Sequence, residues 1–426
     1  MTVQDRRGFI KLAVGGLAVA ATSAGTSCTR HGLNDHVESP WDIASDIIAR
    51  VKPPTYHEQD FDVLSYGAVG DGITDCSLSI EQAISECART GGGRVVIPPG
   101  RFLTGPIRLQ SRVNLHLMTG ATLAFSSDPS RFLPQVLTRF NGIECWNLSP
   151  CIYAYEQSDI AVTGDGVLDG QAAIENWWSW KGVERFGWTP GTPNQEVALA
   201  RLRKMAAQNV SVNDRIFGVA DMLRPMFFQP YRCKNVLIDG VTILRTPSWA
   251  IHPVLCSNVT VRRVTVDSKG PNNDGCNPES CTDVLIEECT FDTGDDCIAI
   301  KSGLNNDGRR VGEATSNVVV RNCVMKNGHG AMTIGSEVSG GAHHIFFDRC
   351  ILEGPNLGWA IRFKSNAQRG GTVEHVYCRD VTANAIRIAA LSIDLQYDEG
   401  PEGDFPPVIR DVELATIRSK NVERVM

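Results

Sequence analysis

The stretch "NVVVRNC" (317–323) decides the fold, because five similar stretches surround it in the sequence. Each begins with Asn, Asp or His, continues with residues rich in β-formers, and ends in Val or Cys at its seventh position. In chain order the stretches are "NVLIDGV" from Asn235, "NVTVRRV" from Asn258, "DVLIEEC" from Asp283, "NVVVRNC" from Asn317, "HIFFDRC" from His344 and "HVYCRDV" from His375. Their starts lie 23, 25, 34, 27 and 31 residues apart, and "DIAVTGDGVL" from Asp159 resembles an earlier copy.

Repeats with periods of about 20–50 residues indicate a solenoid. The repeated units are short and β-branched, and most of them leave no room for an amphipathic helix. We therefore predict an all-β, single-domain, right-handed parallel β-helix, in which each coil stacks its strands on the next. The stretch "SIEQAISECARTGGG" (79–93) has apolar residues at helical spacing. It predicts a helix that caps the N-terminal end of the solenoid and covers its strand edges.

The seventh position of the repeat predicts an interior column of small residues. In chain order it holds Val241, Val264, Cys289, Cys323, Cys350 and Val381. Cysteine that alternates with valine behaves as a small buried hydrophobe. Stacked strands lie ~4.8 Å apart, which is more than the ~3.8 Å between the Cβ atoms of a disulfide. We therefore predict that these three cysteines are free thiols, although fourteen cysteines in an exported protein would suggest disulfides. The pairing of the others stays open.

The N-terminal segment predicts export from the cytoplasm. "DRRGFIKLAVGGLAVAATSAG" (5–25) has paired arginines before an apolar run that is too short to span a membrane, and it resembles a twin-arginine signal. We expect a signal at 1–28, cleaved near Ala24, and a periplasmic or extracellular protein; a lipid anchor at Cys28 is the alternative. A linker would follow at 29–59. The β-helix domain would then span 60–426, with an excursion at about 171–230 that contains "WWSWKG".

Composition excludes several classes of partner. With 42% hydrophobic and 21% charged residues the chain is globular, and its formal net charge of -7 argues against a nucleic-acid partner. The sequence shows neither a phosphate-binding loop after a strand nor zinc-ligand spacing, so we expect no cofactor and no metal. We also expect a monomer.

Four short motifs fall on consecutive coils of the predicted solenoid. They are "PNNDG" (271–275), "GDDC" (294–297), "GHG" (328–330) and "RFK" (362–364), and the steps from Asp274 to Asp296, His329 and Arg362 are 22, 33 and 33 residues. Because a β-helix stacks equivalent positions, we expect three carboxylates, one imidazole and two cations on one face, within ~15 Å at ~4.8 Å per coil. Neighbouring aspartates at 295 and 296 can share that face only if the backbone is irregular there.

These motifs resemble those of glycoside hydrolase family 28, the polygalacturonases, where the order is N-T-D-G, D-D, G-H-G and R-I-K. "YGAVGDGITD" (66–75) and "GGGRVVIPPG" (91–100) also resemble the start of that family, so the resemblance covers about residues 60–425. This chain departs from the motifs at Asn273 and Phe363. The resemblance implies hydrolysis of α-1,4-galacturonide linkages of pectin with inversion, by the bacterial exo-acting branch.

The resemblance also implies the roles of the carboxylates. Asp295 would be the general acid, Asp274 and Asp296 would hold and deprotonate the water, and His329 would contact substrate or tune Asp295. Inverting glycosidases need an acid and a base ~6.5–9.5 Å apart, with room for water between them. Crowding of carboxylates raises the pKa of at least one of them, and we expect this to keep the acid protonated.

Substrate binding is expected to fall to several residues near these motifs. Galacturonate carries a carboxylate, which Arg362, Lys364 and Lys301 would bind. Asn272 is a further candidate contact. "SWAIHP" (248–253) and "GSE" (335–337) resemble the exo-acting branch, so His252 and Glu337 are candidates too, with a core-edge histidine and a solvated acid as the alternatives. The excursion at 171–230 would close one end of the cleft.

Three alternatives stay open at this point. The first alternative is a family member that hydrolyses rhamnogalacturonan or branched pectin. A pectate lyase on the same architecture would use Ca²⁺ and an Arg or Lys base. A carbohydrate-binding β-helix without catalysis, such as a tailspike-like adhesin, would not need the three aspartates together.

Overall fold

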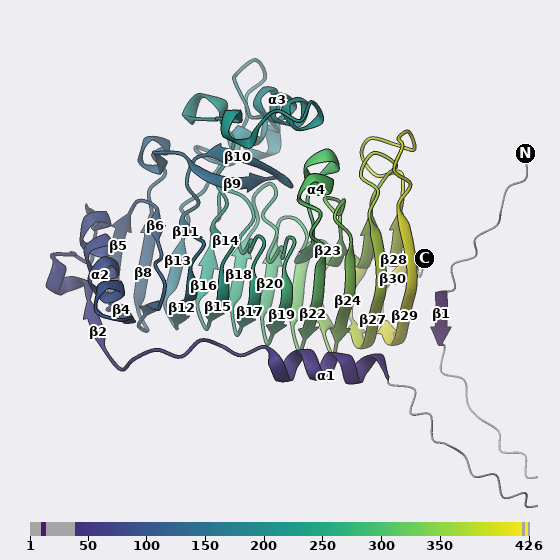
Figure 1. Cartoon of the computed structure of the whole chain (residues 1–426), viewed down its shortest axis with the longest axis horizontal. Helices are drawn as coiled ribbons and strands as arrows, with labels where there is room; N and C mark the ends of the chain where they lie inside the picture. Colours follow the sequence, from purple (N-terminus) through teal and green to yellow (C-terminus); the bar gives the residue numbers. More distant parts are fainter. Residues whose placement is uncertain (1–9, 14–38, 420–421, 425–426) are drawn as a thin grey trace, which may run out of the picture.

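A computed structural model describes residues 10–13, 39–419 and 422–424. Parallel strands stack into coils along the long axis of the molecule (Figure 1). The prediction of a single-domain parallel β-helix is confirmed. Most of the expected export signal, including Cys28, lies outside the described residues.

Three faces make up the solenoid. The first face runs β2 (Asp60–Asp62), β4 (Gly93–Ile97), β7 (Val113–Leu117), β12 (Ser158–Gly164), β15 (Lys234–Asp239), β17 (Ser257–Arg262), β19 (Thr282–Glu287), β22 (Thr315–Arg321), β24 (Ala342–Asp348), β27 (Thr372–Ala383) and β29 (Val408–Ser419), and β1 (Ile10–Ala13) pairs with β29. The second face runs β3 (Asp71–Asp75), β5 (Gly100–Thr104), β8 (Ala121–Phe125), β13 (Val167–Asp169), β16 (Thr242–Leu244), β18 (Thr265–Ser268), β20 (Thr290–Thr293), the start of β23 (Val324–Ile334), β25 (Ile351–Leu352) and the end of β27.

The third face positions the candidate site. It runs β6 (Ile107–Arg108), β11 (Ile152–Tyr155), β14 (Phe228–Tyr231), bridges at Ile251 and Cys276, β21 (Ile298–Ile300), the end of β23, β26 (Leu357–Lys364), β28 (Ile386–Asp394) and β30 (Val422–Arg424). All of these pairings are parallel. One antiparallel hairpin, β9 (Val136–Phe140) and β10 (Ile143–Asn147), leaves the solenoid.

Helices lie at the end and on the outside of the solenoid. They are α1 (Pro40–Arg50), α2 (Ser77–Arg89), α3 (Glu196–Ala207) and α4 (Asn305–Val311), with short 3-10 turns η1 (Val63–Tyr66), η2 (Pro129–Phe132), η3 (Ser179–Lys181), η4 (Glu184–Phe186), η5 (Val212–Asp214) and η6 (Val219–Asp221). The predicted capping helix is confirmed as α2, which buries four residues in the main core: Ile80, Ala83, Ile84 and Cys87. None of the helices in the described part of the chain is long and apolar enough to cross a membrane.

The first residue of each repeat turns the chain into the first face. These six residues, Asn235, Asn258, Asp283, Asn317, His344 and His375, have φ between 54° and 58°. This left-handed region is disfavoured for most side chains but is tolerated by Asn, Asp and His. The side chains also link neighbouring coils, since Asn235 Nδ2 donates to Asp159 Oδ1 at 2.7 Å and Asn258 Nδ2 donates to Asn235 Oδ1 at 2.8 Å. The polar start of the repeat is therefore both a corner and a coil-to-coil contact.

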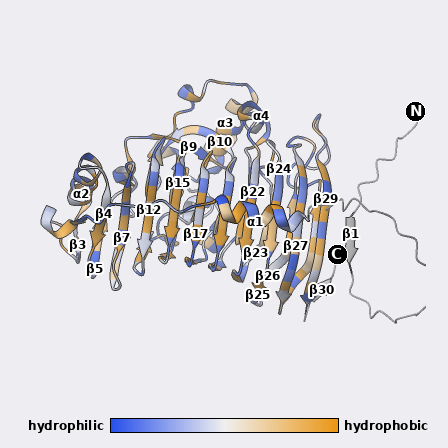
Figure 2. Ribbon diagram, turned by 60° about the horizontal axis from the view of Figure 1, so that its bottom comes forward, coloured by the Kyte–Doolittle hydropathy of each residue, from blue (hydrophilic) through white to orange (hydrophobic). Residues whose placement is uncertain are grey.

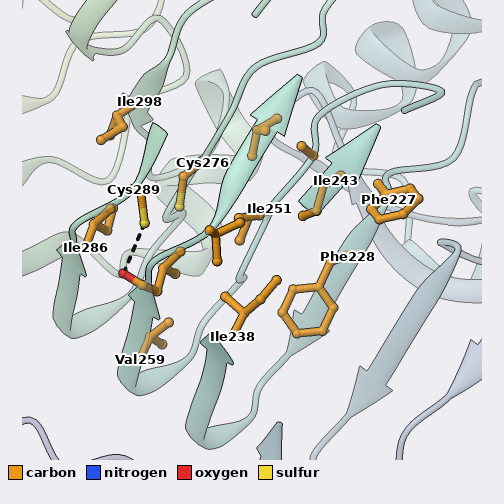
Figure 3. Packing of buried hydrophobic residues seen from close by; sticks show 14 of the residues in the cluster. Phe227, Phe228, Ile238, Ile243, Ile251, Val259, Cys276, Ile286, Cys289 and Ile298 are labelled. Carbon is orange, nitrogen blue, oxygen red and sulfur yellow. Dashed lines mark hydrogen bonds between the residues drawn. The ribbon is translucent and has the colours of Figure 1, made fainter. Parts of the chain in front are cut away.

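The predicted column of thiols lies inside the solenoid. Every cysteine in the described ranges is buried with a free thiol, and Cys289, Cys323 and Cys350 are at most 1% exposed. Figure 3 shows Cys289 among the hydrophobic core residues, with its Sγ donating to the carbonyl oxygen of Val261 at 3.5 Å. The prediction of an interior ladder of free thiols is confirmed.

The segment 29–59, expected as a linker, contains α1. This helix lies across the outside of the first face (Figure 2). It buries Ala44 and Ile47 against outward-facing residues of three strands, Leu285, Val319 and Phe346. The ion pair of Arg50 with Asp283, at 2.7 Å, fixes its C-terminal end. The chain before the solenoid is thus partly docked onto it.

Two excursions lie together beside the third face. One is the β9–β10 hairpin, which the sequence analysis did not anticipate, and the other runs from the end of β13 at Asp169 to the start of β14 at Phe228. They share a second hydrophobic core, which includes Ile143, Leu202 and Leu304, the residue that precedes α4. Figure 1 shows α3, α4 and the hairpin above the middle coils.

The corner column generates a stability prediction. Asn258 has φ of 55°, exchanges hydrogen bonds with the backbone of Lys52 and donates to Asn235. Asn258→Ala should lower the free energy of unfolding by about 2 kcal/mol, from about 1 kcal/mol because alanine tolerates the left-handed conformation less well than asparagine and about 1 kcal/mol for lost hydrogen bonds. Asn258→Gly should recover part of this loss, because glycine accepts the left-handed conformation. Urea denaturation followed by circular dichroism measures both; equal losses for the two variants would contradict the backbone argument.

Candidate active site

Three carboxylates, of which Asp274 and Asp296 are buried and Asp295 is half-buried, lie together at the third face, and each has one cationic partner. Asp295 Oδ1 lies 2.9 Å from His329 Nδ1, and Asp296 Oδ2 lies 2.7 Å from Lys364 Nζ. Asp274 Oδ2 has the weakest pairing, at 3.9 Å from Lys301 Nζ, and accepts a hydrogen bond from Asn277 at 2.9 Å. The structure thus brings the residues of all four motifs together.

Coil stacking sets the positions of these carboxylates. The amide of Gly275 donates to the carbonyl oxygen of Asp296 at 3.0 Å, and the amide of His329 donates to that of Asp295 at 3.0 Å. Gly294 precedes the aspartate pair where two coils approach closely, since a Cβ there would lie 2.3 Å from the carbonyl oxygen of Gly270. The chain bends at Gly294 and Asp295 between β20 and β21. This is the irregular backbone that adjacent aspartates on one face require.

The pKa values differ from the expectation for the acid. Burial raises the pKa of Asp274 well above its usual range, and the charge of Asp295 adds to the effect. Burial would also raise the pKa of Asp295, but the hydrogen bond and charge of His329, with Lys364 and Lys301, lower it to about 2. The hydrogen bond from Asp295 raises the pKa of His329. Burial, together with the charge of Asp295, therefore raises the pKa of Asp274, whereas crowding was expected to raise the pKa of Asp295.

One oxygen of the cluster is left without a partner. Asp296 is 1% exposed, and its Oδ1 has no hydrogen-bond partner among the described residues. The second glycine of the G-H-G motif faces this atom, because a Cβ at Gly330 would lie 3.0 Å from it. A small polar molecule such as water could satisfy Oδ1, since a buried acceptor without a partner is costly.

The three candidate cations differ in their availability. Lys364 is bound to Asp296, and Lys301 is bound to Glu337 Oε2 at 2.7 Å. The Arg362 guanidinium stacks instead on Trp359 at 3.9 Å and lies 5.2 Å from the Tyr397 ring. Its buried Nε has no hydrogen-bond partner, and no carboxylate among the described residues forms an ion pair with it. Arg362 is therefore free to bind an anion bidentately.

His252 does not contact the space at the site. It is 0% exposed, its Nε2 lies 2.7 Å from Glu279 Oε2, and its Nδ1 lies 2.9 Å from Gln229 Nε2. Gln229 in turn donates to the carbonyl oxygen of Arg139, in the β9–β10 hairpin. The hairpin covers this part of the third face, so the expectation that His252 contacts substrate is corrected to that of a buried supporting residue.

The remaining expected contacts are anchored by protein groups. Asn272 is half-buried and accepts a hydrogen bond from Arg224 Nη2 at 2.7 Å. Asn273, where the family motif has Thr, is fully buried; it accepts from Ser268 at 2.7 Å and donates to the Thr246 carbonyl at 3.1 Å. This departure from the motif therefore holds the loop together.

Sequence reasoning missed two groups of the site. Arg224 lies in the excursion, is 0% exposed, and donates to Asn272 and to the carbonyl oxygen of Pro271 at 2.7 Å. Tyr397 lies after β28, and its ring faces Arg362 and Lys364, both at 5.2 Å. No motif marks either residue, because each reaches the site from a loop outside the repeat.

Known proteins resemble the chain over most of its length. The model of "Glycosyl hydrolases family 28" matches residues 220–425, and a model described as "Rhamnogalacturonase A/epimerase, pectate lyase-like" matches residues 61–120. A crystal structure of an exopolygalacturonase from Thermotoga maritima is 44% identical, covers 90% of this chain and 85% of its own, and superposes with a TM-score of 0.86.

Curated relatives agree with this similarity. A probable polygalacturonase of Vitis vinifera is 29% identical over 77% of this chain, and an exo-poly-alpha-D-galacturonosidase of Dickeya chrysanthemi is 25% identical over 84% of it. The chain spans 61% of the length of each of these two relatives. From the match to the family model and the 44% identity, we conclude that the chain belongs to glycoside hydrolase family 28.

Proposed function

We propose that this protein is an exo-acting hydrolase that cleaves α-1,4-galacturonide linkages of pectin with inversion. The observation that carries the proposal is the cluster of Asp274, Asp295 and Asp296 beside the unpaired guanidinium of Arg362. The cluster offers an acid, a base and a water site, and Arg362 offers a partner for a uronate carboxylate. The polygalacturonase names of the relatives support the same substrate class.

Asp274 and Asp296 are proposed to bind the attacking water. The unpartnered Oδ1 of Asp296 can accept one proton of that water in a hydrogen bond, and Asp274 can accept the other. As the water oxygen attacks the anomeric carbon, a carboxylate of this pair takes its proton. The other oxygen of Asp296, Oδ2, accepts a hydrogen bond from Lys364 Nζ at 2.7 Å, so Oδ1 is the oxygen that can accept from the water.

Asp295 and His329 are proposed to supply the proton to the leaving oxygen as a coupled pair. The raised pKa of His329 and the lowered pKa of Asp295 leave the shared proton on the imidazole in the free enzyme. When the glycosidic bond breaks, Asp295 hands the proton to the leaving oxygen and His329 Nδ1, 2.9 Å away, replaces it. The charge balance needs no metal or cofactor.

The excursions support action at a chain end. The β9–β10 hairpin reaches the site edge, where the carbonyl of Gly142 accepts from the amide of Leu304 at 2.9 Å. A Cβ at Gly142 would lie 3.0 Å from Glu337 Cβ, so the hairpin and Glu337 leave no space between them. We propose that this contact closes one end of the substrate path, and the exo-acting names of two relatives support action at a chain end.

Export is part of the proposal. The twin-arginine pattern at Arg6 and Arg7 supports the proposal that the enzyme is exported to the periplasm or the cell exterior.

Product analysis on polygalacturonic acid, with EDTA present, tests the proposed function. We expect monogalacturonate from the first time points, without the ultraviolet absorbance of an unsaturated product. A ladder of saturated oligomers would contradict the exo mode, and loss of activity in EDTA with unsaturated product would indicate a Ca²⁺-dependent lyase. Cleavage of rhamnogalacturonan but not of polygalacturonic acid would show that rhamnogalacturonan is the substrate. Binding without cleavage would indicate a non-catalytic β-helix.

The acid assignment predicts the effect of Asp295→Asn. Turnover should fall by about 10²–10⁴-fold, the usual contribution of a general acid, while circular dichroism and thermal melting stay unchanged. Asp267→Asn is the matched control, because Asp267 lies on the neighbouring coil and pairs with Lys269 at 3.3 Å, outside the cluster. A rate for Asp295→Asn close to that of the control would overturn the assignment.

The free guanidinium predicts the effect of Arg362→Ala. KM for polygalacturonate should rise roughly 10- to 100-fold, because a charge-assisted hydrogen bond contributes about 1.5–3 kcal/mol. On methyl-esterified oligomers, which lack the charge, wild type and variant should differ much less. Arg349→Ala, which removes an exposed arginine paired with Asp348, is the control. An unchanged KM on the charged substrate would place the bound carboxylate elsewhere.

A further inference from the structure

Lys301 is shared by two carboxylates at unequal distances. Its Nζ lies 2.7 Å from Glu337 Oε2 and 3.9 Å from Asp274 Oδ2. The side chains of Lys301 and Asp274 are each 4% exposed, and that of Glu337 is 14% exposed. Because these side chains are almost inaccessible to water, the energy of interaction between the lysine and each carboxylate depends strongly on distance. The carboxylate that holds the ammonium closer therefore takes most of its stabilisation.

The position of the ammonium is fixed from several sides. The Trp249 ring centre lies 4.4 Å from Lys301 Nζ, and the carbonyl oxygen of Gly335 lies 3.5 Å from it. Glu337 is itself held, because its carbonyl oxygen accepts from the amide of Ser302 at 2.6 Å and its side chain abuts Gly142. Lys301 thus cannot approach Asp274 while Glu337 keeps its charge.

We propose that Glu337 is a positioning residue that holds Lys301 away from Asp274 and so sets the pH below which Asp274 stops acting as a base. The naming of Asp274 as a base rests on the proposed function, but the contact between the three side chains does not. This role replaces the expectation that Glu337 contacts substrate. A carboxylate already bound to a lysine would repel the carboxylate of a galacturonate.

The pKa values of the two carboxylates agree with the unequal sharing of Lys301. Asp274 faces Asp295, Asp296, Lys301 and the amide of Asn277, and burial with the Asp295 charge raises its pKa well above the usual range. Burial would raise the pKa of Glu337 as well, but Lys301, with smaller contributions from Arg369 and Lys364, lowers it to about 2. Lys301 is the cation on which both carboxylates depend.

These contacts determine whether each substitution raises or lowers the pKa of Asp274. Glu337→Gln removes the competing charge, so Lys301 stabilises ionised Asp274 and the pKa of Asp274 falls. The acid limb of the kcat/KM profile should then move to lower pH by about one unit, the usual effect of one nearby charge. Lys301→Gln removes the cation, so the same limb should move to higher pH by about one unit. The double variant removes both charges and should return the limb close to that of wild type.

Two measurements test the proposal. The first is the pH profile of kcat/KM on a galacturonate oligomer for wild type, both single variants and the double variant. The second is the titration of the Asp274 carboxyl carbon by nuclear magnetic resonance in ¹³C-aspartate-labelled protein, with the signal assigned by its absence in Asp274→Asn. Glu353→Gln, which neutralises an exposed glutamate, is the control for the loss of one negative charge.

Opposite shifts in the single variants that cancel in the double variant would support the proposal, because a general loss of packing would not produce them. An unshifted Asp274 titration in Glu337→Gln, with a higher KM, would overturn it and return Glu337 to substrate binding. The carboxyl titration needs no substrate. If wild type failed to cleave galacturonan, the proposed function would fail while the titration still decided the role of Glu337.

Discussion

Parallel stacking of coils is the constraint on which the rest of this structure depends. Neighbouring strands lie ~4.8 Å apart, so any residue type that recurs at one position of the repeat meets its own copies along the solenoid. The Asn and Asp corners, the interior thiols and the four motifs of the candidate site all follow from this rule. At the site the rule acts through the backbone, since the amide of Cys297 donates to the carbonyl of Gly330 at 2.8 Å. Residues about thirty positions apart therefore hold distances that side-chain packing alone would not fix.

The same stacking concentrates charge, which the site balances pair by pair. Each buried carboxylate would be costly without a cation beside it, and Asp295 and Asp296 have theirs within 2.9 Å. Asp274 is the exception, because its cationic partner, Lys301, lies closer to Glu337. The pKa of Asp274 is raised by burial and by the charge of Asp295, whereas the hydrogen bond and charge of His329 lower the pKa of Asp295. That inequality allows a group of like charges to divide acid and base roles.

Much of the fold and the members of the site could be predicted from the sequence, because both follow the repeat. The column of Cys289, Cys323 and Cys350 has a local signature, as do the four motifs. The burial of His252 could not be predicted, because the β9–β10 hairpin that covers it has no repeat signal and its contacts are distant in sequence. The ion pair of Lys364 with Asp296 and the lowered pKa of Asp295 depend on distances of a few tenths of an ångström, which residue spacing does not encode. The helix α1 had a usable signal in Ser39 and Pro40 before apolar residues at helical spacing.

The buried thiols have a consequence for where such a chain can mature. No described cysteine needs a partner, and each is sealed from water by the core around it. The stability of the solenoid therefore does not depend on the redox potential of the medium. Such a chain can complete its fold in a reducing compartment, without an oxidase or a disulfide isomerase, and keep the same covalent structure after transfer to an oxidising one. The sulfur atoms only fill space in the core. Because no disulfide has to form, such a chain can fold either before or after transport.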